Sequence, residues 1–356
     1  MSPERVLVYA GKGSSHSWTW MADLLESAGV FDAEFVDAEG LVRNVEGGSS
    51  LVVVSGGDGF EIASSLAPRG FSAIEAHVRG GGMYIGACAG AYLPLPSRIS
   101  PFDTFNLSST RIRNLAPVPD ETAESSPRTG LRYGSCSIVH PVRGEVVVGD
   151  GVRSFTAPIF GGPVFREPES DRVLFRYASF TDRTLFQTER ARAETMMLGA
   201  PAVVSVSVGD GTMVLAGPHL EHPGYPEANR VFVQLAGLAR GNAEPRKAHA
   251  KEIDKSLVRS LADLKVAVVG MERESFLVGA KLWDAGRLLD LVQAVDKRRD
   301  AMDRDTSQAV VSLLDEAREH LMSIGPHRVA DSDSAPAKLV EAARLCVNRH
   351  FEAMKG

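Results

Sequence analysis

The sequence predicts an α/β protein, in which helices cover both faces of a mostly parallel sheet and a helical segment follows toward the C-terminus. Over the first half of the chain, short apolar runs alternate with helical patterns, which is typical of βαβ units. After Gly241, glycine and aromatic residues become rarer and apolar residues recur at helical spacing, as Leu257 and Leu261 do. We therefore expect an α/β domain over residues 1–241 and a helical C-terminal domain over residues 242–356.

Regular elements follow one another along the first 90 residues. Four strands are expected, each a short apolar run, at residues 5–10, 34–36, 51–54 and 83–87. Helical patterns lie at residues 18–28 and 72–79. Cys88 comes directly behind the last of these strands, so the sequence places it at a strand end.

Beyond residue 93 the pattern changes. Residues 94–128 are rich in proline and serine and have no clear periodicity, which indicates a lid, a binding loop or an excursion at one edge of the sheet. Two hairpins are expected next, one that pairs residues 137–142 with 145–148 and one that pairs residues 203–208 with 212–216. A helix is expected over residues 225–239.

The C-terminal segment carries further helical patterns, at residues 276–302, 308–323 and 335–354. Helices of this number and length fit a small bundle or a helical hairpin appended to the α/β domain. We expect the boundary between the two domains near Gly241–Arg246.

Composition and charge argue against several classes of function. The chain has 356 residues, of which 44% are hydrophobic and 24% charged, as in ordinary globular proteins. The formal net charge is −6 and no cluster of lysine or arginine stands out, which argues against a nucleic-acid surface. No apolar run reaches the ~18 residues of a membrane helix, and the N-terminus shows no signal peptide. We expect a cytoplasmic protein without nucleic-acid or membrane partners.

The three cysteines, Cys88, Cys136 and Cys346, are far apart and odd in number. This spacing is neither a disulfide framework nor a zinc pattern, and it suits a reducing compartment. The histidines, among them His140 and His222, show no metal-ligand spacing with carboxylates. We expect no metal and no cofactor, and we interpret Cys136 and Cys346 as structural.

Cys88 stands in the sequence Gly86-Ala87-Cys88-Ala89-Gly90, between a strand and a helix. A nucleophile at such a position lies on a tight turn, and flanking glycines relieve the crowding that the turn creates. The start of a helix and its backbone amides favour a thiolate there. The alternative is a buried structural cysteine among small residues that pack a strand against a helix.

A glycine pair follows the strand over residues 51–54. The amide of Gly57 could turn into the site and form an oxyanion hole together with the amide of Ala89. A simple glycine turn is the alternative interpretation.

His219-Leu220-Glu221 follows the strand expected over residues 212–216. In an extended chain, residues i and i+2 share a face, so Glu221 can orient the imidazole of His219 to activate a thiol. A solvated surface loop is the alternative. The glycine pair, the cysteine and the later His-x-Glu together are more specific than any one of them.

The turn after the first strand carries Gly11, Gly13 and Ser14. With Asp37 about 20 residues later it looks like a dinucleotide-binding fingerprint. His16 stands where the third glycine belongs, so we assign this loop to the substrate side of the site instead.

Three further residues are candidates for binding substrate. Tyr92 follows the elbow, and Gly161 and Gly162 form a glycine pair ahead of Pro163. A plain hairpin turn explains the glycine pair equally well.

The order of these motifs resembles class I glutamine amidotransferases, which use a Cys-His-Glu triad. The sequence more closely resembles the amidotransferase-like domain at the N-terminus of some biotin–protein ligases and its free-standing relatives. The resemblance covers residues 1 to about 240 and depends on VLVYAGKGSS at 6–15, GGMYIGACAGAY at 81–92, FGGPVF at 160–165 and VLAGPHLE at 214–221. It implies a flavodoxin-like fold with Cys88 as nucleophile, His219 as base and Glu221 as its orienting group.

The sequence also departs from that family's pattern. Ala91-Tyr92 follows the elbow where glutaminases usually carry a glutamine-type residue, and Leu220 follows His219 where proline is usual. Both differences favour a substrate other than glutamine, the first more strongly.

Two functions from different classes follow. The first is a cysteine-dependent acyl-transfer enzyme, an amidase or amidotransferase-like hydrolase, that acts on a small-molecule or peptide-like acyl substrate. Ammonia transfer from glutamine would need a synthetase partner, whereas hydrolysis needs none. The second is a non-catalytic binding or regulatory module that keeps the fold, with the helical segment mediating assembly with a partner or another copy of the chain.

Overall fold

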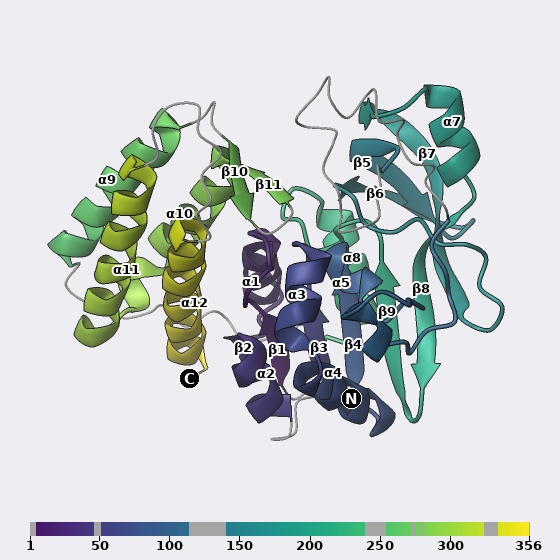
Figure 1. Cartoon of the computed structure of the whole chain (residues 1–356), viewed down its shortest axis with the longest axis horizontal. Coiled ribbons are helices and arrows are strands. Elements are labelled where there is room, and N and C mark those ends of the chain that lie inside the picture. Colours follow the sequence, from purple (N-terminus) through teal and green to yellow (C-terminus); the bar gives the residue numbers. More distant parts are fainter. Residues whose placement is uncertain are drawn as a thin grey trace.

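The computed structural model describes residues 5–45, 51–113, 140–238, 254–271, 275–278, 281–323 and 334–355. Within these ranges the chain forms a nine-stranded sheet with helices on both faces, and further helices pack beside one end of it (Figure 1). The expected α/β class with a C-terminal helical segment is confirmed. The expected domain boundary near Gly241–Arg246 lies outside the described residues and stays a prediction.

The strands of the main sheet are β1 (Val6–Tyr9), β2 (Ala33–Val36), β3 (Leu51–Val54), β4 (Met83–Ala87), β5 (Val142–Gly149), β6 (Ser154–Ile159), β7 (Arg172–Phe186), β8 (Pro201–Val208) and β9 (Gly211–Ala216). Their order in the sheet is β2-β1-β3-β4-β9-β8-β7-β5-β6. Neighbours from β2 to β9 pair in parallel. The remaining neighbours pair antiparallel, including the expected hairpin of β8 and β9.

The parallel strands are buried on both faces. Successive residues of a strand point to opposite sides of the sheet. Val6 and Val8 belong to the apolar core on one face, and Leu7 and Tyr9 belong to the core on the other. This two-sided burial explains why the strands appear in the sequence as continuous apolar runs.

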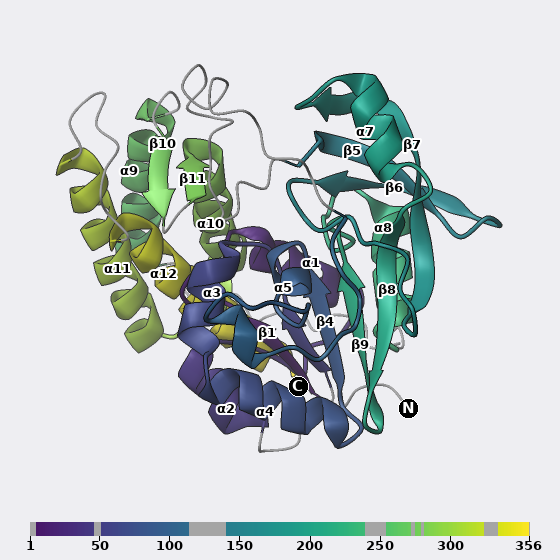
Figure 2. The same ribbon diagram turned by 45° about the vertical axis from the view of Figure 1, so that its right-hand side comes forward.

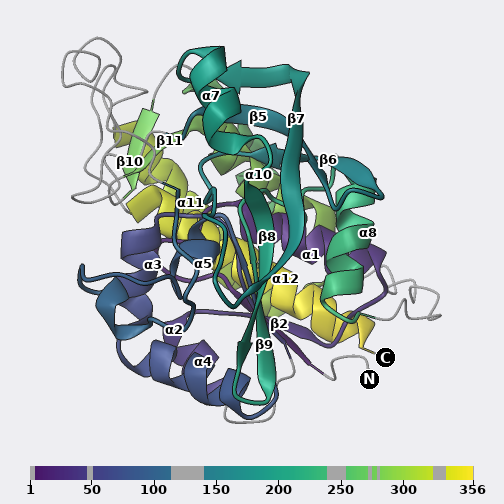
Figure 3. The same cartoon turned by 90° about the vertical axis from the view of Figure 1, so that its right-hand side faces the viewer.

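Helices from different parts of the chain cover the two faces. Figure 3 shows α2 (Ala38–Val45), α3 (Gly59–Leu66), α4 (Arg69–Arg79) and the short α5 (Ala89–Tyr92) on one side, and α1 (Ser17–Ser27) and α8 (Pro226–Leu235) on the other. Helices α2 and α3 were not expected from the sequence. The start of α3 has a local signal, because the Asp58 side chain accepts the amides of Phe60 and Glu61 at 2.9 and 3.2 Å and caps the helix.

One expected hairpin was wrong. Residues 142–149 form the single strand β5, which pairs with β6 and β7, so residues 142 and 145–148 do not face each other across a turn. Gly144 has a φ of +89° and lies at a register shift in the β5–β7 pairing. The glycine therefore marks an irregularity within a strand. The remainder of that hairpin, residues 137–139, lies outside the described residues, as does Cys136.

The described C-terminal segment contains the helices α9 (Lys255–Gly270), α10 (Ala285–Arg298), α11 (Arg304–Ser323) and α12 (Ser334–Met354). Helix α7 (Arg190–Met197) belongs to the α/β part of the chain and lies beside β7, far from these helices (Figure 2). The helix expected over residues 276–302 begins only at Ala285. The residues before it form an antiparallel hairpin, β10 (Ser275–Val278) with β11 (Lys281–Asp284). Aromatic and β-branched residues such as Phe276, Val278 and Trp283 favour strands, which explains the difference.

Helix α12 covers the edge strand β2. The Asn348 side chain accepts the amide of Phe35 and donates to its carbonyl, both at 2.8 Å, and Phe351 packs on Phe35 with ring centroids 5.2 Å apart. The buried core on this face of the sheet continues into the C-terminal helices. Within the described residues, no helix combines the length and apolarity needed to cross a bilayer. The cytoplasmic location stays a prediction.

Candidate active site

Cys88 occupies the sharp turn between β4 and α5, and its backbone is strained. Its φ is +51° and its ψ is −108°, and no other residue except glycine has a positive φ in the described part of the chain. Such a conformation costs on the order of 1–3 kcal/mol and persists only where the surrounding structure fixes it. Here the Cys88 amide donates to the carbonyl of Ala216 at 2.9 Å, and the carbonyl of Gly90 accepts the hydroxyl of Tyr84 at 2.7 Å.

The glycines beside Cys88 are required by close backbone contacts. A Cβ atom on Gly86 would lie 2.4 Å from the carbonyl oxygen of Gly90, and one on Gly90 would lie 2.0 Å from the carbonyl oxygen of Val54. A side chain at either position therefore collides with backbone that cannot move without disturbing the sheet. The sequence pattern around Cys88 is thus the one that a turn this tight demands.

The three side chains expected to act together lie in contact. The Nδ1 atom of His219 is 2.7 Å from Oε1 of Glu221, and the His219 imidazole is also hydrogen-bonded to the Cys88 side chain. Because the carboxylate engages Nδ1, Nε2 is the nitrogen left for the thiol. Exposure of the three residues is 4% for Cys88, 3% for His219 and 0% for Glu221.

The strand order explains how residues so distant in sequence meet. β4 and β9 are parallel neighbours, and their last residues, Ala87 and Ala216, pair directly. Cys88 follows β4 and the segment leading to His219 follows β9, so both emerge at the same edge of the sheet. The amide of His219 donates to the carbonyl of Pro158 at 2.9 Å, which fixes this segment against β6.

The electrostatics of the site favour charged partners. Burial alone would lower the pKa of His219, but the Glu221 carboxylate and the Cys88 sulfur raise it above its ordinary value. Burial would likewise raise the pKa of Glu221, but His219 and the hydroxyl of Ser55 lower it. Near neutral pH, Glu221 is therefore ionised and His219 carries the proton, and a positive imidazole beside a thiol favours the thiolate.

Ser55 is hydrogen-bonded to the Glu221 carboxylate, and Ser17 is hydrogen-bonded to Ser55. The hydroxyl of Ser55 donates to Oε1 of Glu221 at 2.5 Å, and the hydroxyl of Ser17 lies 2.9 Å from that of Ser55. The Ser17 oxygen also accepts the amide of Gly56 at 2.9 Å. A Cβ atom on Gly56 would lie 2.7 Å from Cε1 of His219, so the imidazole reaches its place only because residue 56 is glycine.

Aromatic side chains enclose the imidazole. The rings of Trp20 and Phe160 lie with centroids 5.4 and 5.6 Å from that of His219. His222 also packs on Trp20, at 4.3 Å between centroids. Burial and the charge of His219 lower the pKa of His222, so this second imidazole stays neutral. These rings limit the access of water to the His219–Glu221 pair.

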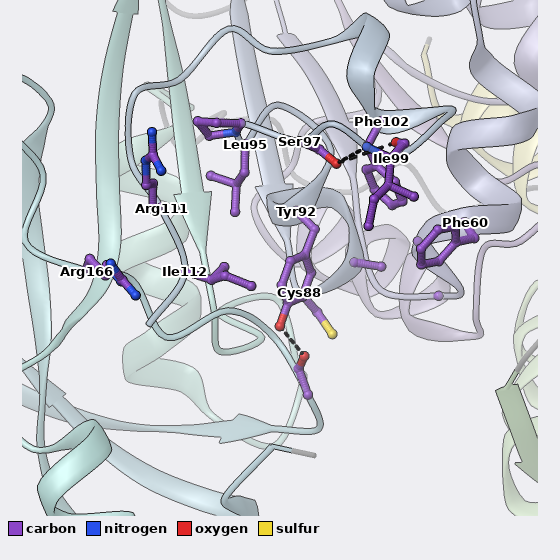
Figure 4. A pocket seen from close by; sticks show the side chains of 15 residues that line it. Phe60, Cys88, Tyr92, Leu95, Ser97, Ile99, Phe102, Arg111, Ile112 and Arg166 are labelled. Carbon is purple, nitrogen blue, oxygen red and sulfur yellow. Dashed lines mark hydrogen bonds between the residues drawn. The ribbon is translucent and has the colours of Figure 1, made fainter. Parts of the chain in front are cut away.

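A cavity of about 380 Å³ opens on the other side of Cys88. Figure 4 shows Cys88 and Tyr92 at its centre, with Phe60, Ile99 and Phe102 on one side and Arg111 and Arg166 on the other. The hydroxyl of Tyr92 donates to the carbonyl of Gly161 at 3.0 Å, which ties helix α5 to the segment after β6.

Four of the residues expected at the site line this cavity: the oxyanion-hole candidates Gly57 and Ala89, and the substrate-binding candidates Tyr92 and Gly161. Gly162 lies beside the elbow, where a Cβ atom would come within 3.0 Å of Cα of Cys88 and 1.8 Å of the carbonyl oxygen of Gly217.

The cavity lining does not include Gly11, Gly13 and Ser14. Their loop backs the glycine turn, since the carbonyl of Gly13 accepts the amide of Asp58 at 2.8 Å. Their role in binding substrate stays a prediction.

Several residues of the site were not expected from the sequence: Ser17, Trp20, Ser55, Phe160, Arg111 and Arg166. Ser55 had a signal, because it lies between a buried strand and the glycine pair. Arg111 and Arg166 had none, since they come together through an isolated antiparallel bridge between Ile112 and Phe165.

Within the ranges that the structure describes, histidines, cysteines and carboxylates form no group of three placed to hold a metal ion. Of the other cysteines, Cys346 is buried in the C-terminal helices, and burial raises its pKa to about 12. Its thiol is therefore protonated and shielded.

The fold and this arrangement of residues define an amidotransferase-like α/β protein. A family model described as biotin-protein ligase, N terminal, matches residues 4–265. The chain belongs to this family, as the sequence motifs indicated.

Individual proteins also match. An uncharacterized protein of Chlamydia muridarum (strain MoPn / Nigg) is 27% identical over 274 residues, which cover 73% of this chain and 96% of that protein. Among solved structures, a glutamine amidotransferase shares 18% identity with a TM-score of 0.42, over 65% of this chain and 99% of that one. A cytoplasmic protein from Salmonella typhimurium shares 11% identity with a TM-score of 0.39, over 66% of this chain and 98% of that one.

Proposed function

We propose that the chain is a cysteine-dependent acyl-transfer enzyme that hydrolyses a carboxamide or a related acyl compound. The observation that supports this proposal best is the geometry of Cys88. Its strained backbone holds the thiol in a hydrogen bond with a buried imidazole, which Glu221 orients, at the wall of an open cavity. A structural cysteine requires neither the strain nor the charged partners.

The first step forms a thioester. The Cys88 sulfur attacks the acyl carbon of the substrate, and the C–N bond of the carboxamide then breaks. His219 gives the proton that it holds to the departing nitrogen, so the amine leaves in its neutral form. We assign stabilisation of the tetrahedral oxyanion to the amides of Gly57 and Ala89, because both residues border the cavity beside Cys88.

The second step returns the enzyme to its starting state. His219, now neutral, takes a proton from water, the resulting hydroxide attacks the thioester carbon, and the C–S bond breaks. The products are a carboxylic acid and an amine, with one water consumed. An amine acceptor in place of water would give transfer instead of hydrolysis, and glutamine-derived ammonia would then require a synthetase partner. Because the thiol must stay reduced, we place this chemistry in a reducing compartment such as the cytoplasm.

The test is selective labelling. With iodoacetamide near neutral pH, Cys88 should react faster than Cys346 and Cys136, as read by peptide mass spectrometry. Trapping of an acyl adduct on Cys88, and its absence in Cys88→Ser, would identify the nucleophile. If Cys88 labels no faster than the other two cysteines in the folded protein, the enzyme proposal fails and the binding or regulatory module is favoured.

A further inference from the structure

Two arginines lie directly opposite each other at the mouth of the Cys88 cavity. The bridge between Ile112 and Phe165 is antiparallel, and the amide of Arg166 donates to the carbonyl of Arg111 at 2.7 Å. In this register Arg111 and Arg166 are cross-strand neighbours, so their side chains share one face with Cβ atoms roughly 5 Å apart. Both residues are exposed and line the cavity.

Nearby carboxylates are occupied by other groups. Glu167, next in the chain to Arg166, makes two hydrogen bonds of 2.7 Å with Arg176. Asp171 accepts the hydroxyl of Thr110 at 2.5 Å. No aspartate or glutamate is among the residues that line the cavity, and within the described residues neither Arg111 nor Arg166 makes an ion pair.

Two like charges that face each other across a strand pair destabilise it unless an opposite charge lies between them. A paired guanidinium surface fits a planar or tetrahedral anion well, because each guanidinium offers parallel N–H donors. The other wall of the cavity is apolar and contains Phe60, Ile99 and Phe102 (Figure 4). Cys88 lies between the two walls.

We propose that the acyl substrate carries an anionic group, a carboxylate or a phosphate, that Arg111 and Arg166 bind while its apolar part lies against Phe60 and Phe102. This inference rests on the proposed function, because it names the substrate class of the same site. Arg111 and Arg166 are specificity-determining residues. Because Cys88 lies between the two walls of the cavity, the reacting acyl carbon lies between the anionic group and the apolar part of the substrate.

The first experiment compares two small alkylating reagents on Cys88. Iodoacetate carries a carboxylate and iodoacetamide is its neutral analogue, so the ratio of their rates reports the field at the cavity mouth. The double variant Arg111→Met, Arg166→Met should lower this ratio roughly three- to tenfold at low salt, with less effect at high salt. Both reagents react with the same Cys88 thiolate, so the ratio does not depend on any change in the thiolate fraction that loss of the two charges causes. Arg98→Met, which removes an exposed arginine outside the cavity lining, is the matched control.

The second experiment identifies the anion. Straight-chain dicarboxylic acid monoamides and alkyl phosphates of matched length are tested for protection of Cys88 against iodoacetamide, with alcohols of the same length as neutral controls. The anionic compounds should protect at lower concentration than the alcohols, and the double variant should remove that advantage. The better of the two series distinguishes a carboxylate from a phosphate.

The outcomes separate the two proposals. If the iodoacetate-to-iodoacetamide ratio is the same in the double variant as in Arg98→Met, or if the alcohols protect as well as the anions, the anionic substrate is excluded. The proposed function would stand in that case, because iodoacetamide reactivity and its dependence on His219 measure the triad alone. If neither reagent reacts with Cys88 in the unsubstituted protein, both proposals fail.

Discussion

The two sides of Cys88 are built in opposite ways. On one side, Glu221, His219 and Ser55 are buried and joined by hydrogen bonds, and each lies at or just beyond the end of a strand of the sheet. On the other side, the cavity is bordered by connecting segments and by residues of α3 and α5, its walls are largely apolar, and its charged residues, Arg111 and Arg166, are exposed.

This difference separates reactivity from substrate choice. The groups that control the thiol are fixed by strands that the fold cannot move without losing its core. The groups proposed to contact a substrate lie at the start of α3 (Phe60), in the excursion after α5 (Phe102 and Arg111) and between β6 and β7 (Arg166), where substitutions disturb the sheet least. We therefore expect changes on the triad side to alter the rate with every substrate, and changes on the cavity side to alter preference among substrates.

The largest effect is expected from His219→Ala. Loss of the group that moves the proton should reduce turnover about 100- to 10,000-fold and slow iodoacetamide labelling of Cys88 near neutral pH. His222→Ala is the control, because that imidazole packs on Trp20 nearby and accepts the amide of Gly224. Equal labelling rates in the two folded variants would remove His219 from the mechanism.

A substrate effect comes next in size. Ala91-Tyr92 follows the elbow and no aspartate or glutamate among the described residues lines the cavity, so the ammonium group of free glutamine would lack a fixed partner, at a cost of about 1–3 kcal/mol, or roughly ten- to hundredfold in selectivity. We expect ammonia release from glutamine to match the Cys88→Ser blank. Saturable, Cys88-dependent release at millimolar glutamine, alone or with candidate partner proteins, would contradict this expectation.

Substitutions of the residues that orient the imidazole should lower turnover less than His219→Ala does, and by different amounts. Glu221→Gln keeps the shape of the side chain but loses its charge, and we expect turnover to fall about tenfold. Ser55→Ala removes one hydrogen bond to Glu221, and the loss should be several-fold, in line with one such bond. Turnover of one substrate in both variants measures the grading. A larger loss in Ser55→Ala than in Glu221→Gln would mean that Ser55 acts on the thiol by another route.

The smallest expected effect is a shift in pH dependence. The pKa of His219 is raised, so the positive imidazole persists beside Cys88 above the ordinary histidine range. This charge favours the Cys88 thiolate, so the midpoint of the curve of alkylation rate against pH should lie below the ~8.5 of a free thiol. The contribution of the His219–Glu221 pair to stability is complete below the ordinary pKa of histidine and is lost as pH rises through the raised pKa. A midpoint at or above 8.5 in the alkylation profile would rule out an activated thiol.

The sequence singled out Cys88, His219 and Glu221 because the local signals around them are strong. Cys88 and His219 each come just after a short apolar run, and the order of the glycine pair, the cysteine and the later His-x-Glu resembles that of amidotransferases. Features that depend on distant pairing could not be inferred. The bulge at Gly144 looks like a turn in the sequence, and the contact of Arg111 with Arg166 depends on where an aperiodic segment comes to lie. Neither composition nor periodicity contains that information.

The parallel pairing of β4 with β9 has a consequence for how the protein is made. A chain that has emerged from the ribosome as far as Cys88 lacks the strand that later becomes the direct neighbour of β4. Contacts of such long sequence separation form slowly, because a long loop must close before they give any stabilisation. Until β9 joins the sheet, Cys88 has no imidazole beside it and behaves as an ordinary thiol. Under the proposed function, activation of Cys88 is thereby tied to completion of the sheet, and fragments that end before β9 carry only an ordinary thiol.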